Sequence, residues 1–172
     1  MPARIDTLCR RWAALPFWYF VVTVYGGSLL IKIVVMLLIS ESARAVGAPL
    51  PDVDVLAPVG LTAIFISSVL VAPVLETAVY QAIPLWLGRR LTAKPFWPIA
   101  ICAGVFASLH YQQAASGMLH AFVVGLMFCA AYWYRAEQPD GQPYLAVVLV
   151  HMLHNLLAWG TEWAQRSGLV PT

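Results

Sequence analysis

Four polar side chains lie within long apolar stretches of this sequence: Glu76, His110, His151 and Asn155. A carboxylate can take a proton from water, while imidazole and carboxamide groups can donate hydrogen bonds to a developing oxyanion. These groups are costly at membrane depth, so they are expected to face the interior of a helix bundle. Because His151 and Asn155 are four residues apart, they share one helix face. The four residues are therefore candidates for an acid–base site inside a membrane.

The expected depths of these residues also agree. Counting about 1.5 Å per residue from the expected cytoplasmic helix ends places Glu76, His110 and Asn155 at roughly 16–22 Å. The same count places His151 at roughly 10 Å. Three different helices are thus predicted to bring polar groups to overlapping levels.

The composition indicates that the helices cross a membrane. Of the 172 residues, 61% are hydrophobic and only 10% are charged, whereas a soluble domain has about 25% charged residues. The net charge is only +2 and the basic residues are scattered, which argues against nucleic acid as a partner. No low-complexity linker or internal repeat divides the sequence, so residues 1–172 are predicted to form a single integral membrane domain.

The hydropathy pattern predicts an all-α, polytopic bundle of about five transmembrane helices. The expected spans cover residues 17–39, 56–87, 96–111, 117–134 and 144–163. The second span is longer than a hydrocarbon core of about 30 Å requires. It is therefore expected to be tilted, or kinked at Pro73 or Pro84.

The basic residues predict the orientation. A cytoplasmic N-terminus leaves only Arg44 and Arg166 of the loop and terminal cations outside, and it places seven inside: Arg4, Arg10, Arg11, Arg89, Arg90, Lys94 and Arg135. This bias predicts a protein of the cell (inner) membrane with its C-terminus outside. Lys32, within the first span, is expected to snorkel towards Glu41 near the outer surface and not to serve an ion pathway.

Three short segments resemble the motifs of the CPBP family of intramembrane proteases, which includes the CaaX-processing endopeptidases. The family motifs are EExxxR, FxxxH and HxxxN. The corresponding segments here are ETAVYQ at 76–81, FASLH at 106–110 and HMLHN at 151–155. Asn155 is the only asparagine in the chain, which makes the third segment the most specific one. The resemblance covers residues 71–159, a motif-bearing core that excludes the first span.

The resemblance implies an intramembrane endopeptidase that acts on a membrane-anchored protein or peptide. In the implied mechanism, Glu76 activates a water held between it and His110, with no covalent intermediate. His151 and Asn155 would then stabilise the oxyanion. The expected partners are this substrate and the lipid bilayer.

The first motif departs from the family pattern at two positions. Thr77 replaces the second glutamate and Gln81 replaces the arginine, so the charged pair of the family is missing. A hydrogen-bonded Thr77–Gln81 pair could take its place at a lower desolvation cost. Together with Phe106 of the second motif, these residues are expected to support the catalytic ones.

Zinc is the main alternative for the chemistry. Glu76, His110 and His151, with His154 as a further ligand, could hold Zn²⁺ and leave a position open for water. The chain lacks an HExxH motif and asparagine is a poor zinc ligand, so the metal-free mechanism without a cofactor is favoured. His120 and His154 belong to no catalytic position of the motifs and are expected to have structural roles.

Other functional classes remain open at this stage. The polar residues could only connect helices, with Glu76 as a protonated acid and His110 bound to a backbone carbonyl. The protein would then be a non-catalytic scaffold, or a bacteriocin-immunity-type protein of the same fold. A proton-coupled carrier is a further alternative, because glutamate and histidine within spans also form proton relays.

Overall fold

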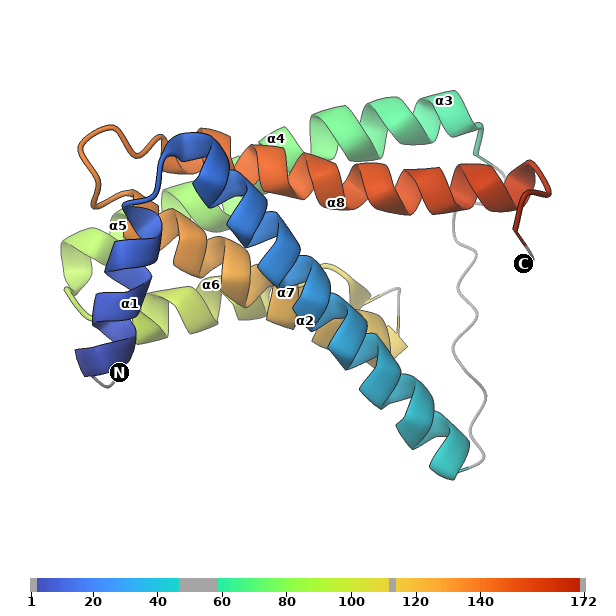
Figure 1. Ribbon diagram of the computed structural model, residues 1–172, viewed down its shortest axis with the longest axis horizontal. Coiled ribbons are helices and arrows are strands. Elements are labelled where there is room, and N and C mark those ends of the chain that lie inside the picture. The colour runs from blue at the N-terminus through green and yellow to red at the C-terminus, as the bar shows by residue number, and fades with distance from the viewer. Residues whose placement is uncertain (1–2, 47–58, 112–113, 171–172) are drawn as a thin grey trace.

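The chain folds into helices connected by turns, as the computed structural model shows for residues 3–46, 59–111 and 114–170 (Figure 1). These described residues contain no β-strand. The prediction of an all-α architecture is confirmed. The start of the predicted second span, near residue 56, lies outside the described residues.

Four helices are long and apolar enough to cross a membrane, judged on the described residues: Phe17–Ala45, Leu61–Leu91, Ser116–Arg135 and Pro143–Arg166. A fifth apolar helix, α6 (Phe96–Ser108), has 13 residues and is about 20 Å long. That length is below the ~30 Å of a hydrocarbon core. The chain is thus a multi-pass helical membrane protein with four long spans and one short apolar helix.

The N-terminal region consists of a short helix, α1 (Ala3–Ala13), and the long helix α2 (Phe17–Ala45). Pro16 precedes α2 in an extended conformation, which separates the two helices. The α1 helix packs against α7 (Ala114–Arg135), where the Tyr134 hydroxyl donates a hydrogen bond of 3.1 Å to Asp6. The start of α2 is thereby fixed to the rest of the bundle.

The helix between residues 61 and 91 contains two π-helical segments. Each of them is followed by an α-helical segment that has a proline near its start. A proline at position i has no N–H, and its ring clashes with the carbonyl of residue i−4. For Pro73 and Pro84 these carbonyls belong to Val69 and Tyr80, which lie inside the π segments. The expected distortion at the prolines therefore takes the form of widened turns. In order, the segments are α3 (Leu61–Ile64), η1 (Phe65–Val71), α4 (Ala72–Thr77), η2 (Ala78–Ala82) and α5 (Ile83–Leu91).

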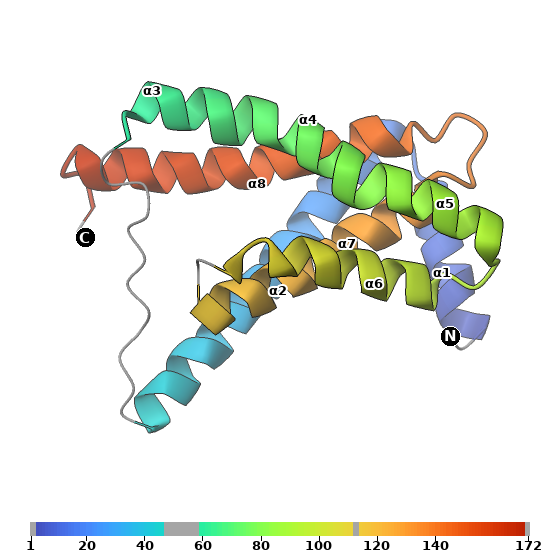
Figure 2. The same cartoon turned by 180° about the vertical axis from the view of Figure 1, so that it is seen from behind.

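The long helices are arranged as a wedge (Figure 1). The last helix, α8 (Pro143–Arg166), runs beside the 61–91 helix, as both views show (Figure 2). The α2 helix starts near the beginning of α8 and diverges from it along its length (Figure 1). The α6 and α7 helices pack closely: a Cβ at Gly125 would lie 3.1 Å from the Phe106 ring. This close packing holds Phe106 against α7.

At the narrow end of the wedge, one arginine connects two turns of the chain. Arg135, at the end of α7, is buried and donates hydrogen bonds to the carbonyls of Ala13 and Leu15 at 2.6 Å each and of Gly141 at 2.7 Å. Its guanidinium also lies over the Phe20 ring at 5.0 Å. The sequence predicts that Arg135 is a charge in a loop, but its side chain connects the α1–α2 turn to the α7–α8 turn.

Candidate active site

The candidate carboxylate and the first histidine of the third motif lie next to each other. Nε2 of His151 on α8 is 3.7 Å from Oε2 of Glu76 on α4. This distance exceeds that of a direct hydrogen bond, so the two groups are neighbours without a direct hydrogen bond between them. The His151 side chain is buried, whereas one third of the Glu76 side chain is exposed. Glu76 thus lies at the edge of the packed core, next to α8.

Phe106 connects the second motif to the third. Its ring centroid lies 4.8 Å from that of His110 and 5.8 Å from that of His151. Phe128 of α7 packs against His151 from another helix, with a centroid distance of 5.3 Å. These edge and tilted contacts fix the imidazole planes, which explains why an aromatic residue stands four positions before His110.

The tautomer of His110 follows from its backbone contact. Its Nδ1 lies 3.0 Å from the Phe106 carbonyl oxygen, which can only accept a hydrogen bond. Nδ1 of His110 is therefore the donor, and in the neutral ring the lone pair is on Nε2. His110 is thus bound to a backbone carbonyl, as its structural role would require. This bond uses Nδ1 and leaves Nε2 able to accept a hydrogen bond from water.

Asn155 is oriented by a carbonyl that a proline leaves free. In η1 the N–H of Ala72 bonds to the carbonyl of Ser67, five residues earlier. The next bond of this register would join residue 73 to Ser68, but Pro73 has no N–H. The Asn155 amide instead donates to the Ser68 carbonyl at 2.7 Å. One of its two N–H groups is used in this way, which fixes the plane of the amide.

A cavity of about 190 Å³ brings these residues to a common space. His110, His151 and Asn155 line it together with Phe106 and Phe128. Glu76 reaches this group through its contact with His151. The cavity is large enough for several water molecules.

Three further polar residues that have no catalytic role in the predicted mechanism line the same cavity: Lys32, His120 and His154. Nε2 of His154 lies 2.7 Å from Ser28 Oγ, while the Ser28 hydroxyl donates to the Val24 carbonyl. His154 Nε2–H therefore donates to Ser28 and ties α8 to α2. The signal for His154 was its spacing of three residues from His151, since positions i and i+3 are also neighbours on a helix.

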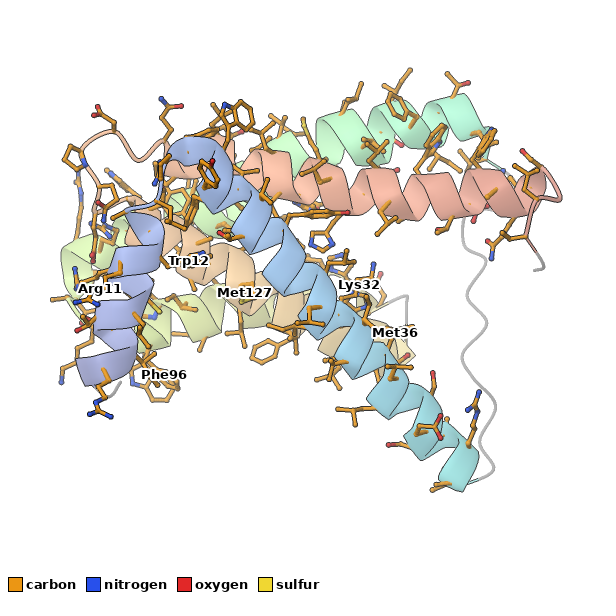
Figure 3. All side chains as sticks on the ribbon, viewed as in Figure 1. Arg11, Trp12, Lys32, Met36, Phe96 and Met127 are labelled. Carbon is orange, nitrogen blue, oxygen red and sulfur yellow. The ribbon has the colours of Figure 1, made fainter. Side chains whose placement is uncertain are left out.

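Lys32 was expected to snorkel towards Glu41 near the outer surface, but its side chain lines the cavity. Glu41 pairs with Arg44 at 2.7 Å instead, near the end of α2. Lys32 lies in the opening between α2 and α8, as Figure 3 shows, where it lines the cavity. Its position one turn after the buried Ser28, on the same face of α2, was the sequence feature that could have indicated this orientation.

The two departures in the first motif are fully buried. Thr77 and Gln81 are 0% exposed, and among the described residues the Thr77 hydroxyl and both polar atoms of the Gln81 amide have no hydrogen-bond partner. The expected Thr77–Gln81 hydrogen bond is therefore not formed. A neutral pair at this position avoids the larger cost of burying a carboxylate and a guanidinium.

The described residues contain no group of three histidine, cysteine, aspartate or glutamate side chains arranged as metal ligands. Glu76, His110 and His151 are thus not placed as a zinc set, although Glu76 and His151 are neighbours.

The fold and the site define a multi-pass helical membrane protein with imidazoles and a carboxamide around one cavity and a carboxylate next to one of these imidazoles. Residues 58–157 match the protein family described as type II CAAX prenyl endopeptidase Rce1-like. This match covers more than half of the chain and includes all three motifs. The chain therefore belongs to the Rce1-like family, and the resemblance seen in its motifs is confirmed. Neither a curated protein nor a solved structure matches the chain.

Proposed function

We propose that the protein is an intramembrane endopeptidase that cleaves a peptide bond near the end of a membrane-anchored protein or peptide. The observation that carries this proposal is the contact of Glu76 with His151 beside a cavity that His110 and Asn155 also line. Family membership supports the same activity, because the family is described as one of CAAX prenyl endopeptidases. The scaffold and carrier alternatives have no comparable support.

The proposed reaction is hydrolysis without a covalent intermediate. A water molecule donates one hydrogen bond to Nε2 of His110, and Glu76 takes its proton as the water oxygen attacks the carbonyl carbon. The carbonyl π electrons move to the oxygen, which becomes the oxyanion. Glu76 then gives the proton to the amide nitrogen, and the C–N bond breaks to release an amine and a carboxylic acid.

His151 and Asn155 are the proposed oxyanion donors. Nδ1 of His151 has no hydrogen-bond partner among the described residues, and Asn155 has a second N–H beyond the one bound to Ser68. Asn155 therefore retains a donor, and His151 retains one in the tautomer that carries its proton on Nδ1. In a cavity lined by two phenylalanines, each such donor is worth more than in water, because the effective dielectric constant is low.

The test compares the wild type with Glu76→Gln in liposomes that contain a membrane-anchored peptide substrate. Glutamine keeps the shape of the side chain but cannot take the proton, so cleavage measured by mass spectrometry should fall to background. Glu41→Gln is the matched control, because Glu41 lies near the exposed end of α2 and pairs with Arg44. Cleavage by Glu76→Gln at the wild-type rate would refute the mechanism. Absence of cleavage by the wild type on every substrate, with Glu76-dependent proton flux, would instead indicate a carrier.

A further inference from the structure

The first helix, α1, exposes apolar side chains beside the face that packs on the bundle. Asp6, Cys9 and Ala13 are partly or fully buried and form the packed face. Ile5 and Leu8 are three residues apart on an adjacent side of the helix, where they are 44% and 63% exposed. Two large aliphatic side chains are thus exposed on a helix that lies outside the membrane spans.

The arginines of α1 fall into two groups. Arg10 is used within the protein, because it pairs with Asp6 at 2.8 Å and with Glu137 of the α7–α8 turn. Arg4 and Arg11 are exposed and form no ion pair among the described residues. They are seven residues apart, so they lie within about 20° of each other around the helix and roughly 10 Å apart along it. One face of α1 therefore presents two guanidinium groups without counter-charges, next to the exposed apolar side chains.

The orientation of α1 places this face at the level of a membrane surface. The helix runs across the direction of α8, at the end of the bundle where α5 ends and α6 begins (Figure 1). Since α8 is long enough to cross a membrane, α1 lies along the surface of that membrane. Exposed aromatic side chains occur at the same end of the bundle: Trp18 and Tyr19 at the start of α2, and Phe96 and Trp97 at the start of α6. Such side chains gather where the hydrocarbon core meets the headgroups. Figure 3 shows Phe96 and Arg11 at this end of the protein.

We propose that α1 is an interfacial helix that binds the phosphate groups of anionic phospholipids through Arg4 and Arg11, while Ile5 and Leu8 insert between the acyl chains. A guanidinium donates charge-assisted hydrogen bonds to phosphate oxygens. Helices with basic residues on one side and aliphatic residues on another lie in the headgroup region of a membrane in this way. None of the four residues lines the cavity, so this surface does not depend on the proposed peptidase function.

The surroundings of α1 favour a lipid over an acidic protein as the partner. The carbonyl of Ala13, the last residue of α1, accepts a hydrogen bond of 2.6 Å from the buried Arg135, which holds the helix at the level of the headgroups. Two further cations, Arg90 and Lys94, are exposed at the same end, against the exposed Asp140 of the α7–α8 turn. An excess of positive charge at the headgroup level attracts an anionic leaflet.

The experiment measures amide hydrogen exchange of the full chain in two kinds of vesicle. One is made of phosphatidylcholine alone and the other of equal parts of phosphatidylcholine and phosphatidylglycerol. The amides of α1 should exchange at least about tenfold more slowly in the mixed vesicles, as expected for two arginines at an anionic surface. The amides of α8 are the internal reference and should exchange equally in both. The difference should largely disappear in about 1 M NaCl, where the screening length falls to about 3 Å.

The main variant removes the two charges of the proposed surface. Arg4→Gln/Arg11→Gln should exchange at equal rates in the two kinds of vesicle. Arg90→Gln/Lys94→Gln is the matched control, because it removes the same charge at the same end of the protein, and it should keep most of the difference. Glu76→Gln, in the proposed peptidase site, should behave like the wild type, since lipid binding requires no catalysis.

Four outcomes would overturn the inference. The first is equal exchange of wild-type α1 in the two kinds of vesicle, which would leave an acidic protein as the partner of this face. The second is an equal loss in both double variants, which would replace the α1 site by the general charge of this end of the protein. The third is slower exchange on addition of inorganic phosphate to phosphatidylcholine vesicles, which would assign the site to a free anion. The fourth concerns Ile5→Ser/Leu8→Ser, which should exchange faster in both kinds of vesicle; an unchanged rate would contradict the insertion of these side chains.

Discussion

Asn155 on α8 is bound to the backbone of the neighbouring helix through the Ser68 carbonyl, at 2.7 Å. This bond exists because Pro73 cannot donate the N–H that the π-helical register would bring to Ser68. A residue with no polar group thus determines how a candidate catalytic amide is oriented. The relationship explains why the site includes a distorted helix and suggests where it can be perturbed without touching the cavity.

Replacing this proline should impair the site indirectly. Pro73→Ala introduces an N–H that competes with Asn155 for the Ser68 carbonyl, so the amide loses its fixed plane. Turnover is expected to fall about tenfold while the protein stays folded, a smaller loss than removal of an oxyanion donor. Pro84→Ala is the control, because it changes η2 and not η1. Equal effects of both substitutions would show that helix distortion in general, and not the Asn155 bond, controls turnover.

The three polar residues of the third motif should respond differently to alanine. His151→Ala and Asn155→Ala each remove a proposed oxyanion donor, and each is expected to lower turnover about 10²-fold or more. His154→Ala removes the bond to Ser28 between α8 and α2, so it should lower the melting temperature more than the turnover. Turnover and thermal unfolding at matched expression distinguish the two effects. An undiminished rate in Asn155→Ala would rule out its oxyanion role.

Chelation tests whether cleavage requires a metal cofactor. The proposed mechanism assigns proton transfer to Glu76 alone, so EDTA or 1,10-phenanthroline should leave the cleavage rate unchanged. Elemental analysis of the purified protein should find no stoichiometric zinc. A chelator-sensitive rate that added Zn²⁺ restores would transfer the water activation to a metal held by Glu76 and the histidines.

The buried residues Thr77 and Gln81 of the first motif lead to a prediction about the stability of the protein. Gln81→Arg places a guanidinium at a fully buried position without a carboxylate, which should destabilise the protein by several kcal/mol. Adding Thr77→Glu supplies the counter-charge, so the double variant should recover part of the loss. Thermal unfolding in detergent measures both. Gln165→Arg, at an exposed position, should have little effect, and a double variant no more stable than Gln81→Arg would show that the two positions do not interact.

Because α6 is short, the membrane topology shows whether this helix crosses the membrane. Five crossings place the termini on opposite sides, whereas four crossings place them on the same side. The positive charges predict a cytoplasmic N-terminus and an external C-terminus, which requires α6 to count as a crossing despite its 13 residues. Reporter fusions at both ends test this. A cytoplasmic signal at the C-terminus would mean that α6 enters the membrane without traversing it.

The helical architecture could be predicted because apolar stretches of about 20 residues have few other solutions in a membrane. The proximity of Glu76 and His151 also followed from the cost of leaving either group against lipid. The boundaries of α6 were predicted less well: the helix ends at Ser108, before His110, and no turn-forming residue in the sequence marks this end.

The orientation of the Lys32 side chain could not be predicted from the sequence of its own helix. Its expected snorkelling depended on distance to the membrane surface, which can be counted along the sequence. Its observed place depends on the side of α2 that faces α8, which is set by the Ser28–His154 contact across 126 positions of the chain. Such a pairing of distant residues cannot be obtained from periodicity alone. The same limitation applies to Arg135, whose three carbonyl partners come from two turns.

The Arg135 junction has a consequence for the response of the protein to acid. The guanidinium stays protonated and its partners are carbonyls, which do not titrate, so this junction keeps its strength as the pH falls. The α1 helix is held in a different way. The hydrogen bond from Arg10, outside the spans, keeps the pKa of Asp6 below its usual value, so the stability that Asp6 contributes is present above the pKa of the unfolded state. It is lost as the pH falls through the lower, folded pKa. Acidification should therefore weaken the amphipathic N-terminal helix, whose last residue, Ala13, stays bound to Arg135, while the arrangement of α2 against α7 and α8 persists.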